Sequence, residues 1–171
     1  DKGSQPNAVL CRTNSKVLQE YISHKAKHPN AIINVSCDTT NVLEFAEALL
    51  ELDLKGRTSY PLMRTFKTSK QFYSWLQITD EPLDIEIRHM SILCNKINPK
   101  VVVETLKNYK DHRSPDITIS TAHKAKGLEW DTVLLSDDFP ILTNDSKEEL
   151  RLFYVALTRA KTNLNGMKQY R

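Results

Sequence analysis

The stretch AVLCRTNSKVLQEYISHKAKHPNAIINV, residues 8–35, decides the fold of this chain. It opens with four apolar residues and closes with the apolar run at 31–35, and each run is typical of a buried strand. Between them, Asn14 or Ser15 can cap a helix that continues to about Lys27, and the following His-Pro-Asn sequence ends it. A strand, a helix and a strand in this order form the unit of a parallel sheet, so we predict an α/β fold.

The rest of the chain changes character twice. From Asp38 to about Asp111, apolar residues recur at helical spacing and no alternating strand pattern is present, which predicts an α-helical insertion over 38–111. After it, residues 1–37 and 112–171 are expected to complete one α/β lobe. Its remaining elements are predicted as strands at Ile117–Ser120 and Thr132–Leu135, a helix from Lys147 to Ala160 and a last short strand over 163–167.

The composition excludes several classes of protein. The 171 residues carry Lys+Arg 24 against Asp+Glu 21, a net charge of +3 that is too small to indicate nucleic-acid binding by itself. No apolar run reaches ~18 residues, so no membrane-spanning segment is expected. Three Cys without a Cys-x-x-Cys pair favour neither a disulfide framework nor a thiolate zinc site, and indicate a reducing compartment.

The ends and the glycines add two expectations. The chain opens without Met and without an apolar leader, so we expect a fragment of a longer protein with no secretion signal. Its Gly 4 cannot supply the Gly-x-x-x-x-Gly-Lys-Ser/Thr spacing of a P-loop, so the chain alone is not expected to hydrolyse a nucleotide. Asp80-Glu81 superficially resembles an acidic Mg²⁺-binding pair, but the residues around it indicate a turn and a helix start.

Residues 120–131, STAHKAKGLEWD, carry the strongest chemical signal. A strand end is followed by Thr121, His123 and Lys124, which can contact phosphates and hydroxyls. Gly127 permits an unusual backbone angle, and the carboxylate of Glu129 suits a ribose hydroxyl. The competing interpretation is an exposed basic loop without a ligand, and a metal site at the histidine is disfavoured because no second ligand lies at a workable spacing.

Residues 148–161, EELRLFYVALTRAK, form the second signal. Acids at the start of this helix and cations at its end complement the helix dipole, and for Arg151 and Lys161 we favour that structural role alone. Arg159 follows an apolar face, and its guanidinium could extend from the sheet edge toward a γ-phosphate held by a neighbouring lobe.

Three segments together resemble a known family. Residues 8–14, 120–130 and 154–160 resemble, in order, motifs IVa, V and VI of the UvrD/Rep/PcrA-like superfamily 1 DNA helicases. Residues 129–133 and Asp137-Asp138-Phe139 further resemble the F-box DNA helicase branch. The resemblance implies a RecA-like lobe of the P-loop NTPase type, called 2A, which lacks the P-loop itself and is the second of two lobes that sandwich ATP.

The resemblance also implies residue roles. Arg159 matches the arginine finger, and Glu129 matches the carboxylate that contacts the nucleotide ribose, with Gly127 shaping its loop. The positions that match DNA-facing residues are Arg12, Thr13, Asn14, Thr121, His123 and Lys124. The implied cofactors are ATP and Mg²⁺, with the Mg²⁺ ligands outside this chain. The implied partners are single-stranded DNA and the N-terminal RecA-like lobe of the same protein, without a membrane.

The helical insertion stands where the family often carries a large 2B domain, so we expect a reduced 2B-like region. Residues 54–79 contain five cations and no Asp or Glu, interleaved with aromatic residues. They could form a DNA-stacking surface. Phe72, Trp75 and Leu76 share one helical face, however, and a core stripe is the favoured interpretation.

The functional prediction is therefore the C-terminal motor lobe of an ATP-dependent DNA helicase or translocase, inactive as an ATPase alone and associated with DNA repair or recombination. Two alternatives stay open. One is a non-catalytic DNA-binding or scaffolding domain, and the other is part of a helicase-nuclease of the RecB type. The expected compartment is the nucleus, or the bacterial cytoplasm in association with the nucleoid.

Overall fold

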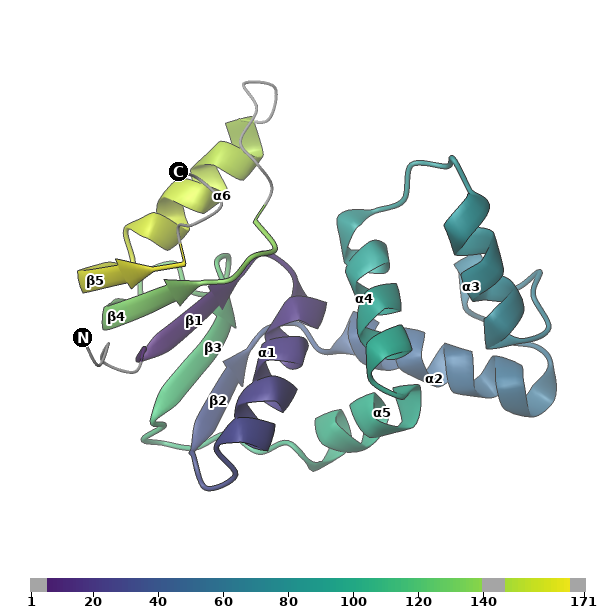
Figure 1. The fold of residues 1–171 in the computed structure, drawn as a ribbon, viewed down its shortest axis with the longest axis horizontal. Helices are drawn as coiled ribbons and strands as arrows, with labels where there is room; N and C mark the ends of the chain where they lie inside the picture. Colours follow the sequence, from purple (N-terminus) through teal and green to yellow (C-terminus); the bar gives the residue numbers. More distant parts are fainter. Residues whose placement is uncertain (1–5, 140–146, 167–171) are drawn as a thin grey trace. The chain divides into compact units, whose positions relative to one another are not determined.

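The computed structural model describes residues 6–139 and 147–166. They form two compact units, one made of the residues up to Cys37 with those from Lys110 onward, and one made of Asp38–Tyr109 (Figure 1). No described helix is long and apolar enough to cross a membrane.

The first unit contains one parallel sheet. Its strands are β1 (Ala8–Cys11), β2 (Ile33–Ser36), β3 (Ile117–Thr121), β4 (Trp130–Leu135) and β5 (Ala160–Asn165). They lie in the order β2-β3-β1-β4-β5, and every neighbouring pair is parallel (Figure 1). The predicted α/β fold with a parallel sheet is confirmed.

Strand β1 is the centre of this sheet and is buried on both faces. Val9 and Cys11 belong to a core that includes Val17 of helix α1 (Asn14–Lys27). Ala8 and Leu10 belong to a second core formed with helix α6 (Lys147–Leu157) and the segment after β3. A four-residue strand covered on both sides must be apolar throughout, which explains the uninterrupted Ala-Val-Leu-Cys run.

The strand register brings distant loops together at two edges of the sheet. At the carboxyl edge, Cys11 pairs with Thr121, so the loops after β1 and β3 leave the sheet side by side. At the amino edge, Trp130 pairs with Ala160, so Glu129 and Arg159 are neighbours there. Residues 122–129 run from the first edge to the second, because they join the end of β3 to the start of β4.

Several predicted boundaries need correction. Strand β2 begins at Ile33 rather than at residue 31, and β4 begins at Trp130 rather than at Thr132. Helix α1 is capped by Thr13, whose Oγ1 accepts from the backbone N of Lys16 at 3.3 Å, rather than by Asn14 or Ser15. The helix predicted to reach Ala160 ends at Leu157. A hydrogen bond from the N–H of Trp130 to the carbonyl of Arg159, 3.0 Å, joins the following residues to β4, so β5 begins at Ala160. Of the last strand, predicted over 163–167, residue 167 lies outside the described residues.

The second unit is helical. It consists of α2 (Thr40–Lys55), a short 3-10 turn η1 (Pro61–Met63), α3 (Ser69–Ile78), α4 (Ile85–Lys96) and α5 (Pro99–Asn108). No residue of 38–109, all of which the structure describes, lies in a strand. Asp80-Glu81 precede α4, whose first turn is capped by the side chain of Asp84. Helix α2 packs against the other three helices, and Phe45, Leu49 and Leu52 on it are fully buried.

Candidate functional site

The loop between β1 and α1 is held by a carboxylate from the other end of the chain. Asp138 accepts from the backbone N of Arg12 at 2.9 Å, and from the backbone N and Oγ1 of Thr13 at 2.9 and 3.0 Å. Thr13 is 1% exposed and Asp138 9% exposed. Because buried backbone N–H groups need an acceptor, this carboxylate fixes the conformation of the loop.

The Arg12 side chain is fixed by a second carboxylate. Its Nε donates to Glu149 Oε2 at 2.8 Å, and one terminal nitrogen donates to Oε1, which is a bidentate pair. These hydrogen bonds lower the pKa of Glu149, partial burial opposes the effect, and the nearby His123 ring acts in the same direction as the arginine. The guanidinium therefore has one defined position at the carboxyl edge, close to the histidine of the neighbouring loop.

The segment after β3 alternates between buried and exposed residues. The N–H of Ala122 donates to the carbonyl of Cys11 at 2.9 Å, and Oγ1 of the buried Thr121 accepts from the backbone N of Lys124 at 3.3 Å. Ala122 and Ala125 are fully buried, whereas the side chains of His123 and Lys124 are exposed. The loop is thus anchored by small residues and presents two lysines, Lys124 and Lys126, and one imidazole to solvent.

The six predicted DNA-facing residues therefore divide by burial. His123 and Lys124 are exposed, and Arg12 and Asn14 are half-buried. Thr13 and Thr121 are buried, and both use their hydroxyl oxygens to accept from backbone N–H groups. All six lie at or just after the carboxyl ends of β1 and β3, and we call them the carboxyl-edge cluster.

A second group of predicted site residues lies at the amino edge of the sheet. Gly127 has φ +86°, in the left-handed region that favours glycine, and two residues later the exposed Glu129 begins the approach to β4. Its Oε2 is 3.9 Å from Nζ of Lys161 on β5. Gly127, Glu129 and Arg159 are called the amino-edge cluster below.

Arg159 lies in the turn between α6 and β5, bound to its own chain. Nε donates to the carbonyl of Val155 at 2.9 Å, one terminal nitrogen to the carbonyl of Leu128 at 3.1 Å, and the other to Thr158 Oγ1 at 2.9 Å. A guanidinium has five N–H donors, so these three bonds leave two for a further acceptor. The contact with Leu128 ties the arginine to the loop that carries Glu129.

The predicted site residues thus lie in two clusters at opposite edges, and two supporting residues were missed. The sequence patterns relate Asp138 to a family likeness and Glu149 to the helix dipole, whereas in the fold both side chains fix the Arg12 loop. The sequence gives only a weak signal for these supporting roles, because an acidic residue that follows an apolar strand can have many roles. In the part of the chain that the structure describes, no three His, Cys, Asp or Glu residues converge as a metal site requires.

Comparison with known proteins gives one family. Residues 10–165 match the family described as UvrD-like helicase C-terminal domain. The chain is 27% identical to F-box DNA helicase protein 1 of Schizosaccharomyces pombe over 179 aligned residues, which cover 93% of this chain and 20% of that protein. It is 32% identical to F-box DNA helicase 1 of Gallus gallus, over 50% of this chain and 10% of that protein.

A further relative is also named as a DNA helicase. The chain is 37% identical to ATP-dependent DNA helicase srs2 of Schizosaccharomyces pombe over 48% of its residues and 10% of that protein. In each of these alignments the chain spans a fifth or less of the relative's length.

Proposed function

This chain belongs to the UvrD-like helicase C-terminal domain family, and from that premise we propose that it is the C-terminal motor lobe of an ATP-dependent DNA helicase or translocase. The observation that carries the proposal is the separation of two clusters at opposite edges of one sheet, joined by the continuous segment 122–129. A motor lobe needs such a connection, because it must couple a change at its nucleotide site to a change at its DNA site.

The carboxyl-edge cluster is the proposed DNA-binding surface. Arg12, Asn14, His123 and Lys124 contact single-stranded DNA, and phosphate contacts of this kind bring affinity without sequence preference. Thr13 and Thr121 take part by holding the two loops, which their burial and backbone hydrogen bonds support.

The amino-edge cluster is the proposed contribution to the nucleotide site. Its donor set fits ATP, because Arg159 keeps two N–H donors for a phosphate oxygen and Glu129 offers an exposed carboxylate to a ribose hydroxyl. Gly127 shapes the loop that presents this carboxylate. Bound ATP supplies the phosphoryl group to be transferred. Arg159 stabilises the charge on it as an arginine finger, and the P-loop and the Mg²⁺ ligands belong to the N-terminal lobe of the same protein.

The two clusters act together through residues 122–129 and α6. Arg159 donates to Leu128 in this segment, and the same segment presents Lys124 at the other edge. A change in the position of Arg159 on closure of the two lobes would therefore move the loop that grips the strand. In this assignment, residues 1–37 and 112–171 are the 2A lobe, 38–111 replace a 2B domain, and the parent protein works on DNA in the nucleus or the bacterial cytoplasm.

The proposal is tested by measuring DNA-stimulated ATP hydrolysis by the full-length parent and by this 171-residue chain side by side. We expect hydrolysis by the parent and none by the chain, because no P-loop spacing exists among its glycines. Hydrolysis by the chain alone would refute the assignment. Inactivity of the parent would favour the scaffolding alternative.

The DNA surface is tested separately by fluorescence anisotropy of the chain with single-stranded DNA at several salt concentrations. Lys124→Ala should weaken binding about five-fold and reduce the slope of log affinity against log salt by about 0.7, the loss of one phosphate contact. The matched control is Lys27→Ala, an exposed lysine at the far end of α1. Equal effects of the two substitutions would contradict the proposed surface.

A further inference from the structure

The helical unit carries a hollow of about 570 Å³ on the exposed side of α3, which we call the α3 hollow. Its walls combine the aromatic rings of Phe66 and Trp75 with the apolar side chain of Ile78, and Lys70 and Gln71 lie at its polar side. None of these residues takes part in the two clusters of the other unit.

The aromatic residues on and before α3 are only partly buried in the core of the helical unit. Phe72 is fully buried and lies 5.5 Å from the ring of Phe66 and 6.0 Å from that of Trp75, measured between ring centroids. The favoured core role of the aromatic stripe is thus correct for Phe72. Phe66 and Trp75, however, keep part of their surface exposed, and Ile78 beside them is 80% exposed. A grouped apolar surface of this kind is typical of a binding site.

Two lysines lie at or next to the α3 hollow: Lys70 lines it, and Lys67 stands in the sequence between the lining residues Phe66 and Thr68. Lys67 and Lys70 are exposed, and among the described residues neither forms an ion pair within 4.0 Å. Among the acids of this unit, Asp53 is occupied at the start of α3, where it accepts from Ser69 N at 2.8 Å and from Ser69 Oγ at 2.6 Å, and the exposed Asp80 and Glu81 follow the end of α3. The hollow therefore offers flat rings and the charge of Lys70 to the same ligand, with the charge of Lys67 adjacent in the chain.

We propose that the α3 hollow binds single-stranded DNA, with bases stacked against Phe66 and Trp75 and phosphates beside Lys67 and Lys70. Every base has a π-face, so stacking of this type is worth about 1–3 kcal/mol per base and tolerates any sequence. Lysine charge complements the phosphate backbone at the same place. The inference rests on the proposed function, since it assigns a further DNA contact to a chain that is proposed to bind single-stranded DNA.

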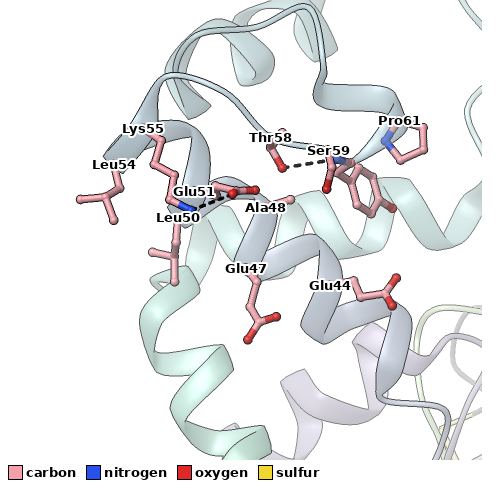
Figure 2. A pocket seen from close by; sticks show the side chains of 11 residues that line it. Glu44, Glu47, Ala48, Leu50, Glu51, Leu54, Lys55, Thr58, Ser59 and Pro61 are labelled. Carbon is pink, nitrogen blue, oxygen red and sulfur yellow. Dashed lines mark hydrogen bonds and ion pairs between the residues drawn. The ribbon is translucent and has the colours of Figure 1, made fainter.

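A larger hollow on the same unit has the opposite chemistry. It measures about 670 Å³, and Figure 2 shows Glu44, Glu47 and Glu51 of α2 along it, with Lys55 paired to the last of these. Three glutamates and one lysine give the lining of this hollow a negative net charge, which repels phosphate. The size of a hollow alone therefore does not identify a DNA site. The α3 hollow is selected by its charge and its exposed rings.

The test uses tryptophan fluorescence in the whole chain. The sequence has Trp 2, Trp75 and Trp130, so Trp130→Phe leaves Trp75 as the sole reporter. Titration with an oligothymidylate of about ten nucleotides should quench this fluorescence, because the bases stack on the ring. An abasic oligonucleotide of equal charge should leave it unchanged. Anisotropy shows the concentration at which the intact oligonucleotide saturates the chain. A lack of tryptophan quenching at that concentration would overturn the inference.

Charge substitutions supply the second measurement. Lys67→Glu with Lys70→Glu should weaken binding of the oligonucleotide at least five-fold and abolish the quenching. Both side chains are exposed, so folding is preserved and is checked by circular dichroism. The matched control is Lys96→Glu with Lys100→Glu on the same unit, which should change affinity less than two-fold. Equal losses in the two double variants would overturn the inference.

The design separates this inference from the proposed function. If Lys124→Ala weakens DNA binding while the fluorescence of Trp75 does not respond to DNA, the α3 hollow is refuted and the DNA surface of the first unit stands. If the chain and its full-length parent bind no single-stranded DNA at all, both fail.

Discussion

Asp138→Ala is expected to destabilise the first unit strongly, because one side chain satisfies three donors of the loop between β1 and α1. These donors are the backbone N–H groups of Arg12 and Thr13 and the hydroxyl of Thr13, at 2.9 to 3.0 Å. Hydrogen bonds to a charged group contribute about 1.5–3 kcal/mol each, and an unpaired buried donor is costly. Allowing for non-additivity and for entry of water, the free energy of unfolding should fall by about 3–5 kcal/mol.

The loss is measured by urea unfolding followed through tryptophan fluorescence. Trp75→Phe leaves Trp130 at the start of β4 as a reporter of the first unit alone. With an m-value of about 2 kcal/mol per molar urea, the unfolding midpoint should fall by about 2 M. The loop that carries Arg12 should lose its geometry at the same time, so DNA affinity should also fall.

The control is the adjacent acid. Asp137 lies 2.7 Å from Lys16 Nζ, but its side chain is 77% exposed. An ion pair with an exposed partner contributes about 0–1 kcal/mol, so Asp137→Ala should shift the midpoint by less than about 0.5 M. If the two substitutions have equal effects, the carboxylate of Asp138 does not hold the loop as described.

Three further predictions follow from local contacts. Gly166→Ala should be more damaging to stability than Gly127→Ala: a Cβ on the first would clash with a β4 carbonyl, whereas the second meets no atom within 4 Å and carries only the left-handed backbone strain, about 1–2 kcal/mol. Half-buried Cys37 should react with a thiol reagent in the native chain, while the two buried cysteines react only after unfolding, because burial raises their pKa values; simultaneous reaction of all three thiols would be the contrary result. The contact with Arg12 lowers the pKa of Glu149 from its ordinary value of 4.5. The stability that the ion pair gives to the fold is therefore complete above pH 4.5 and is lost as the pH falls through the lowered pKa. Glu149→Gln should flatten this part of a plot of unfolding free energy against pH, and an unchanged plot would argue against the pair.

The sheet could be predicted because its strands are short, apolar and separated by clear breakers. Residues 8–35 carry this signal, and the structure has β1, α1 and β2 within about two residues of where the pattern places them. The end of α6 could not be predicted, since Ala160 suits a helix as well as a strand. The hydrogen bond between Trp130 and Arg159 decides it, and a contact between residues so far apart leaves no local pattern.

The candidate site shows the same division. The residues of both clusters could be selected from the sequence because they lie in three ordered motifs. Their arrangement at opposite edges required the strand register, which pairs Cys11 with Thr121 and Trp130 with Ala160. The support that Glu149 gives to Arg12 spans 137 positions of sequence, so it became visible only in the fold.

The central claim is that Arg159 completes a nucleotide site of the parent protein. It is tested most directly by the ATP turnover of the full-length parent carrying Arg159→Ala, measured at saturating single-stranded DNA. We expect turnover to fall by about 10³-fold or more, as for loss of an arginine finger, with DNA affinity changed little. The control is Arg151→Ala, which removes an exposed arginine of α6, and this variant should hydrolyse ATP at the normal rate. Near-normal turnover of the Arg159→Ala protein would contradict the account.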